Sequence, residues 1–256
     1  GLHPFDWRGF WEYGTGALGD IGCHTLDAPY KTLQLGYPSS VECTATNVFK
    51  KMWTPEYTPE GCPISSMVTL EYNNSPHNKD GIKLIWMDGG LTPTIPEEIE
   101  DEFIMNYDMG NSSGIMMLGA KGVITSEIYA NNPTLYIKGE APVVFDTSKQ
   151  PNVNDVHAAT WTEACKAGFN SVEHKNLTSS FDYSGPFTET VIMGNLALRS
   201  RDLRKFVGTR NNGSKIMKYF GRKKLLWDGE NMKIKNLEQA NAFVSKEYRK
   251  GWNLPI

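Results

Sequence analysis

The order of predicted strands and helices constrains the fold of this chain more than any other feature of its sequence. Residues 41–49, 66–72 and 82–87 alternate partly between apolar and polar side chains, are rich in β-branched or aromatic residues, and follow one another without a helix between them. Further strand-like segments are residues 115–119, 122–125, 134–137, 225–227 and 232–234. Strands that come in runs predict an α+β fold with a largely antiparallel sheet, because a doubly wound fold would alternate strands with helices.

Helical segments flank and follow these strands, at residues 17–35, 155–167, 189–207 and 237–248. In the first of them Leu18, Ile21 and Leu26 recur at helical spacing, and Pro29 is expected to kink its middle. Residues 91–113 carry prolines and a run of carboxylates and are expected to form a surface loop. We expect residues 1–256 to form one domain.

Composition excludes several classes of function. Lys and Arg number 26 against 29 Asp and Glu, both signs are scattered, and the net charge is −3, so no footprint for nucleic acid or an anionic membrane is present. No window approaches eighteen consecutive apolar residues, and the first residues lack signal-peptide character, which indicates a mature fragment. The four cysteines form no CxxC motif and are expected to be ordinary buried thiols: Cys23, Cys43, Cys62 and Cys165.

The most informative stretch for chemistry is residues 7–27. On a helix, Asp20, His24 and Asp27 fall on one side together with Lys31. A carboxylate one turn from an imidazole can orient its ring, which suits a general acid or base. An ordinary exposed helix face is the alternative. A metal site is a weaker hypothesis, because further ligands are not evident nearby.

An aromatic cluster precedes this helix and contains Trp7, Phe10, Trp11 and Tyr13, with Arg8 among them. Such clusters are typical of a core or an interface, and the functional alternative is a platform on which a sugar ring stacks while Arg8 donates to its hydroxyls. Residues 14–19 match G-x-G-x-x-G, but no strand precedes them and no βαβ unit follows, so a dinucleotide-binding loop is rejected.

Residues 7–27 resemble the segment that opens the C-terminal domain of the Gfo/Idh/MocA oxidoreductases, the relatives of glucose–fructose oxidoreductase and inositol dehydrogenase. That family's pattern is a glycine pair, an aspartate, three residues, a histidine and commonly another aspartate, and it falls here on Gly16, Gly19, Asp20, His24 and Asp27. The C-terminal part of the chain is similar to the branch with an extended C-terminal α/β domain, at residues 195–199, 226–228, 236–242 and 248–252.

The resemblance implies a large open, mostly antiparallel mixed β-sheet with helices packed on one face. It also implies that the family's N-terminal Rossmann domain and catalytic lysine lie outside this sequence, so that the chain alone is inactive and NAD or NADP binds mainly to the missing domain. His24 would be the acid/base on the substrate and Asp20 its partner. Arg8, Trp11 and Asp27 would contact substrate.

By the same resemblance, the substrate is a sugar, a sugar derivative or a cyclitol that reacts at a secondary hydroxyl. Two alternatives stay open: a redox-neutral glycosidase or 3-keto-sugar enzyme of the same family, and a non-catalytic binding or assembly module. The open sheet face is expected to pack on a second copy, with Met67, Leu70, Leu84 and Trp86 on strands that could contribute. The compartment is not indicated, since the family has cytoplasmic and exported members.

Overall fold

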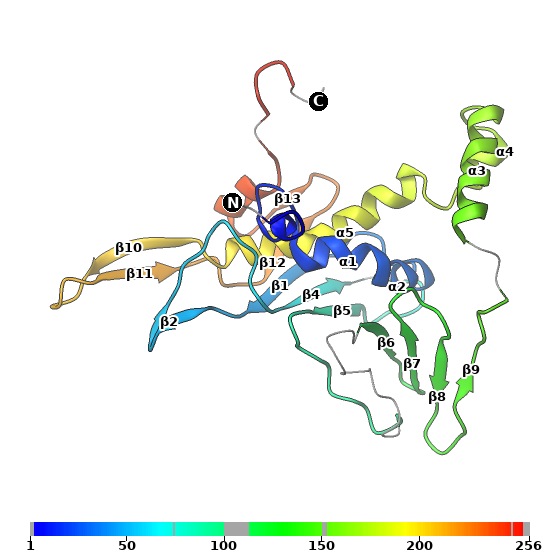
Figure 1. Cartoon of the computed structure of the whole chain (residues 1–256), viewed down its shortest axis with the longest axis horizontal. Coiled ribbons are helices and arrows are strands. Elements are labelled where there is room, and N and C mark those ends of the chain that lie inside the picture. The colour runs from blue at the N-terminus through cyan, green and yellow to red at the C-terminus, as the bar shows by residue number, and fades with distance from the viewer. Residues whose placement is uncertain (1–2, 74, 100–112, 150–152, 247, 253–256) are drawn as a thin grey trace. The chain divides into compact units, whose positions relative to one another are not determined.

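The chain is an α+β protein in which all paired strands are antiparallel over the part that the computed structural model describes, residues 3–73, 75–99, 113–149, 153–246 and 248–252 (Figure 1). The predicted fold class is therefore confirmed. The helices are η1 (Asp6–Gly9), α1 (Gly16–Thr25), α2 (Asp27–Thr32), α3 (Val153–Ala167), α4 (Val172–Lys175), α5 (Phe181–Ser200) and η3 (Glu238–Phe243). The strands are β1 (Ser40–Ala45), β2 (Phe49–Lys51), β3 (Thr54–Pro55), β4 (Ser66–Tyr72), β5 (Ile82–Met87), β6 (Gly114–Leu118), β7 (Val123–Glu127), β8 (Thr134–Tyr136), β9 (Val143–Val144), β10 (Arg204–Thr209), β11 (Lys215–Tyr219), β12 (Leu225–Asp228) and β13 (Lys233–Ile234).

The described residues form two compact units, which we describe separately. The first unit comprises residues 1–23, 33–93 and 190–256, and the second comprises residues 24–32 and 94–189. The boundaries fall inside α1 and α5, so each of these helices contributes to both units. The resemblance implied one domain of residues 1–256, and this stays a prediction.

The first unit is built on a five-stranded sheet with the order β13-β12-β1-β4-β5. Its interior strand β4 alternates strictly between buried and half-buried residues along its length. The buried set faces the core and consists of Ser66, Val68, Leu70 and Tyr72. This alternation is the one that the sequence showed, because successive side chains of a strand point to opposite faces.

α1 and α5 pack on the face of the sheet to which Leu70 belongs. A methyl group at Gly194 of α5 would collide with Leu18 of α1 and lie 3.1 Å from a Val68 methyl carbon of β4. The three elements therefore meet at Gly194, where the missing side chain lets the helix approach closely. The hydroxyl of Tyr72 also donates to Thr190 Oγ1 of α5 at 3.3 Å, and both residues are buried.

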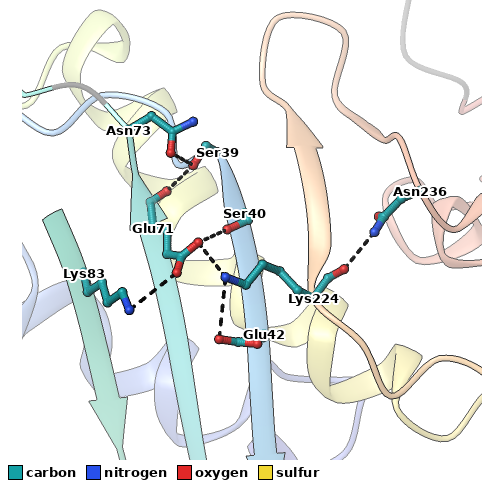
Figure 2. A network of polar contacts seen from close by, with 8 residues as sticks. All are labelled: Ser39, Ser40, Glu42, Glu71, Asn73, Lys83, Lys224 and Asn236. Atoms are coloured by element: carbon teal, nitrogen blue, oxygen red, sulfur yellow. Dashed lines mark hydrogen bonds and ion pairs between the residues drawn. The ribbon is translucent and has the colours of Figure 1, made fainter. Parts of the chain in front are cut away.

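The opposite face of this sheet, which we call the open face, carries a polar network (Figure 2). Glu71 accepts hydrogen bonds from Lys224 Nζ at 2.7 Å and from Ser40 Oγ at 2.9 Å. Lys224 also lies 3.9 Å from Glu42, and Lys83 lies 3.8 Å from Glu71. The Lys224 ammonium, helped by Ser40, lowers the pKa of Glu71 below its usual range.

The residues expected on the open face need correction. Leu70 and Leu84 are buried in the core of the first unit, and Trp86, two positions after Leu84, lies on the same side of β5. Met67 does lie on the open face. Its large exposed apolar neighbours there are Ile85 of β5 and Leu226 of β12, which are 51% and 41% exposed.

The outer edge of this sheet is closed by an asparagine. Ile234 of β13 donates its N–H to Asn241 Oδ1 at 2.8 Å and accepts from Asn241 Nδ2 at 3.0 Å. The amide side chain of η3 thus takes the place that a further strand would occupy. The Asn236 side chain likewise binds two backbone groups at the start of β12: it accepts a hydrogen bond from the Leu226 N–H and donates one to the Lys224 carbonyl.

The second unit contains a four-stranded antiparallel sheet with the order β6-β7-β8-β9, together with α2, α3, α4 and the first part of α5. β6, β7 and β8 lie where the sequence predicted strands. α3 also agrees with its prediction, and α4 begins at Ser171, whose side chain accepts from the His174 N–H. Residues 100–112 of the expected acidic loop lie outside the described residues.

Candidate active site

Two glycines hold the predicted site segment in place in the first unit. η1 is followed by a turn in which Gly14 packs against the backbone of Arg8, with only 2.5 Å between its would-be Cβ and Arg8 Cα. Gly16 begins α1 with a φ of +68°, a conformation that favours glycine. Any side chain at Gly14 would push Arg8 away, so the turn requires glycine and fixes Arg8 beside the helix.

Arg8 pairs directly with Asp20. Its Nη1 lies 2.5 Å from Asp20 Oδ2, and each side chain is 34% exposed. The guanidinium also stacks 4.3 Å from the centroid of the Phe5 ring, which holds its plane. The sequence had assigned Arg8 to substrate and Asp20 to His24. The structure instead shows the carboxylate of Asp20 engaged by Arg8, so Asp20 can orient the histidine only with its remaining acceptor capacity.

His24 is exposed and belongs to the second unit, where its ring meets Tyr129. The two ring centroids are 5.4 Å apart, and the planes are nearly perpendicular at 79°. Among the described residues, neither ring nitrogen of His24 has a hydrogen-bond partner. The imidazole is thus held through an aromatic edge contact and keeps both nitrogens available for a ligand.

Asp27 is tied into an aromatic cluster of the second unit. It begins α2 and accepts a hydrogen bond of 2.5 Å from the hydroxyl of Tyr183 in α5. Burial and this carboxylate raise the pKa of Tyr183 well above its usual range. Tyr30 and Phe187 pack around the same ring at centroid distances of 5.8 and 5.9 Å. Asp27 therefore anchors α5 to α2, a structural role that makes direct substrate contact secondary.

Sequence reasoning did not find Tyr129 and Tyr183, the two ring partners of this region. Tyr183 lies 156 positions from the aspartate that it contacts. Tyr129 follows β7 in a turn whose residues carry no motif. Pairings at such separations leave no periodic signal in one sequence. Only the folded chain brings these side chains to α1 and α2.

Trp11, the last of the predicted substrate contacts, lines a cavity of the first unit together with Arg199. The Arg199 guanidinium lies 5.9 Å from the centroid of the Trp11 ring. The predicted contact residues are thus distributed among three settings: the Arg8–Asp20 pair, the Asp27 cluster and this cavity. His24 is the member that stands exposed without polar partners.

The four cysteines differ in their exposure to solvent. Burial raises the pKa of Cys43 to about 11 and of Cys62 to about 12, as expected of inert thiols. Cys23 and Cys165 are exposed, so the expectation of burial was wrong for these two. Across the described ranges, no group of three or more His, Cys, Asp or Glu residues is arranged to hold a metal ion.

Comparisons with known proteins add no family assignment. Neither the protein-family models nor the curated proteins gave a match to this chain. In the described part of the chain, no helix combines the length and the apolar character needed to cross a membrane.

Proposed function

We propose that this chain is the substrate-binding half of an NAD- or NADP-dependent oxidoreductase that acts on a secondary hydroxyl of a sugar, sugar derivative or cyclitol. The observation that carries the proposal is the exposed His24 imidazole, whose nitrogens have no polar partner among the described residues, on a helix that bears Asp20 one turn earlier. The segment around it is the one that resembles the Gfo/Idh/MocA oxidoreductases.

The chemistry assigned to this chain is a proton transfer. In the oxidation direction His24 accepts the proton of the substrate hydroxyl through a ring nitrogen, and in reduction it returns the proton to the carbonyl oxygen. The nicotinamide, when bound, accepts or supplies the hydride. An imidazole is the side chain that most often carries out such a proton transfer. Tyr129 limits the orientation of the ring through its edge contact.

Asp20 has a supporting role in this proposal. Arg8 neutralises its carboxylate and holds it at a fixed place on α1. Loss of the Arg8 side chain would free the carboxylate. We therefore assign Arg8 as a positioning residue for Asp20. In this proposal Arg8 itself does not contact the substrate.

The proposal places cofactor binding outside this chain. The G-x-G-x-x-G match at residues 14–19 follows η1 and a turn, and it leads into α1 without a preceding strand. This arrangement differs from the strand–loop–helix unit that binds a pyrophosphate. We assign no residue of this chain to the nicotinamide cofactor.

A second copy of the chain is the proposed partner of the open sheet face. Ile85 and Leu226 are the exposed apolar side chains there, and the charged network of Glu71 and Lys224 lies between their strands. An interface with a partly polar centre is within the normal range for association. Sedimentation of wild type and Ile85→Lys would test it, since the variant should dissociate if this face joins two copies.

The decisive experiment uses the natural protein that contains this chain. His24→Ala and His24→Gln are compared with wild type for NAD(P)-linked turnover of a sugar and cyclitol panel, measured by absorbance of the reduced nicotinamide. His157→Ala is the matched control, because His157 is an exposed histidine on α3. We expect both His24 variants to lose turnover by at least about a hundredfold, in line with general acid–base catalysis, with cofactor affinity unchanged.

The other outcomes discriminate between functions. Cleavage of a glycoside without net reduction of the nicotinamide would replace the dehydrogenase by the redox-neutral alternative. Wild-type turnover by both His24 variants would refute the assignment of His24. Unchanged binding of the sugar panel by these variants, with no turnover by any protein, would favour a non-catalytic module.

A further inference from the structure

A cavity in the first unit, separate from the residues assigned to proton transfer, gathers an unusual number of arginines. It has a volume of about 510 Å³ and is lined by the loop after β1, the β3–β4 connection, the end of α5, the β10–β11 hairpin and η3. Pockets that bind small organic molecules have volumes of about 300–1,000 Å³. The size alone therefore allows a small-molecule ligand, and the charges identify its class.

Four guanidinium groups line the cavity: Arg199, Arg201, Arg204 and Arg222. The carboxylates in its wall are Glu56 and Asp202, and Glu56 already pairs with Lys50 at 2.5 Å. Among the described residues, no ion pair joins any of the four arginines to a carboxylate. The cavity thus holds an excess of positive charge, although the chain as a whole has a net charge of −3.

Aromatic rings contact three of these guanidinium groups, whereas Arg201 donates to the Thr46 carbonyl and to Asn47 Oδ1, each at 3.4 Å. Arg204 stacks 3.4 Å from the centroid of Tyr57, and Arg222 stacks 3.8 Å from that of Tyr219. A guanidinium stacked on a ring keeps its plane fixed and its N–H groups in the plane free to point at an acceptor. This arrangement preorganises donors without consuming the positive charge.

Arg199 is the arginine least satisfied by the protein. It stands 4.4 Å from the centroid of Phe243 and 5.9 Å from that of Trp11, and among the described residues no hydrogen bond or ion pair engages it. Burial lowers its pKa, which records the cost of keeping this cation away from water. A guanidinium in that position gains most from a ligand that supplies a planar or tetrahedral anion.

We propose that this cavity binds a small organic anion, a carboxylate or phosphate ester on a compact polar molecule, with Arg199 as its anchor. The two headgroups share the chemistry that guanidinium groups recognise, so the test separates them. A hollow of this volume, with Trp11 and Tyr57 in its wall, fits a ring-sized molecule. The proposal does not depend on His24 or on any oxidoreductase activity.

Binding is measured by calorimetry on the full chain with three probes: glucose 6-phosphate, glucuronate and glucose. Glucose is the neutral control of the same ring size. We expect saturable binding of at least one anion, no binding of glucose at the same concentrations, and weaker binding as salt rises. The ratio of the two anion affinities tells which headgroup the cavity prefers.

Arg199→Met is the test variant, and Arg210→Met, an exposed arginine in the β10–β11 turn, is its matched control. Loss of one charge-assisted contact corresponds to about tenfold to hundredfold weaker binding. Arg199→Met should lose that much, while Arg210→Met should bind as wild type does. Equal binding by Arg199→Met and wild type, or equal binding of glucose and the anions, would overturn the proposal.

A measurement on wild type avoids dependence on how the variants fold. Cys62 lines the cavity, whereas Cys165 is exposed on α3. An anion in the cavity should slow alkylation of Cys62, followed by mass spectrometry, and leave Cys165 unaffected. If saturating amounts of both anions protect neither thiol, or protect both equally, the cavity is not the binding site.

Discussion

Gly194, at the contact of α5 with α1 and β4, offers a sharp test of the packing described here. Alanine in place of glycine inside a helix normally adds about 1 kcal/mol of stability. In this position the added methyl group would overlap Leu18 Cδ2 and lie 3.1 and 3.3 Å from the two Val68 methyl carbons. Carbon atoms pack at about 3.5–4.0 Å, so the core has to move.

The two effects oppose each other, and the structure decides which is larger. Overpacking a filled core costs about 1–3 kcal/mol. Leu18 and Val68 are 1% and 0% exposed, so neither can relieve the contact by turning into solvent. We therefore expect a cost at the upper end of this range, about 3 kcal/mol, so that after the gain of about 1 kcal/mol in helix propensity Gly194→Ala lowers the free energy of unfolding by about 2 kcal/mol.

Urea unfolding followed by circular dichroism measures this change, with an unchanged m-value as the check that the unfolding reaction is the same. Leu18→Ala supplies a second arm, because it removes the methyl carbon that the new side chain meets. The double variant should be less destabilised than the sum of the single variants, by about 1–2 kcal/mol. A Gly194→Ala protein as stable as wild type, or strict additivity of the two substitutions, would refute this account of the helix contact.

Three further predictions concern single groups. Glu71→Gln should lower the free energy of unfolding relative to wild type at neutral pH but not in acid. The lowered pKa of Glu71 stabilises the folded wild type above the ordinary glutamate pKa, and this stabilisation is lost as pH falls through the lowered value. A difference in unfolding free energy that does not change with pH would contradict this prediction. Tyr183→Phe should cost about 1–2 kcal/mol by leaving the Asp27 carboxylate without its donor, measured by urea unfolding, and an unchanged midpoint would show that water replaces the hydroxyl. Cys62 should be alkylated more slowly than Cys165 at pH 8, because burial raises the pKa of Cys62 to about 12; equal rates by mass spectrometry would show that Cys62 is not shielded.

Two strands of the first unit were predictable to the residue. β4 and β5 occupy the predicted ranges 66–72 and 82–87, because one face of each strand packs on the core and the pattern records it. The predicted strand 41–49 is instead β1 followed by β2. The Thr46 N–H still donates to the Ser65 carbonyl, one step beyond the last β1–β4 pair, and the strand breaks only after it, a boundary that periodicity does not show.

Helix ends were harder to predict than helices. The segment 17–35 forms two helices, and Pro29 falls in the first turn of α2, where its missing N–H is tolerated. α5 begins at Phe181, whereas the sequence predicted a start at residue 189. The first turns were missed because they contain Pro186, and proline is rare inside helices. The predicted helix, residues 189–207, also extended too far and included the first residues of β10. The hairpin turn after β10 was visible in the sequence, because Asn212 and Gly213 are typical turn residues.

The last predicted helix, residues 237–248, is the short 3₁₀ segment η3. For the site, sequence reasoning could place His24 and Asp20 on one helix because their spacing is local. It could not predict that Arg8 forms an ion pair with Asp20 or that four arginines line one cavity. Both features depend on the tertiary arrangement of loops.

The asparagine that closes the sheet at β13 has a consequence for what this protein can become under stress. A strand whose outward N–H and carbonyl are free is a template on which another chain can polymerise. Asn241 forms hydrogen bonds with both the N–H and the carbonyl of Ile234, so at this residue another strand would find no free backbone group with which to pair. The Asn241 side chain therefore prevents a further strand from pairing at Ile234. This protection lasts only as long as η3, which carries Asn241, stays packed against β13.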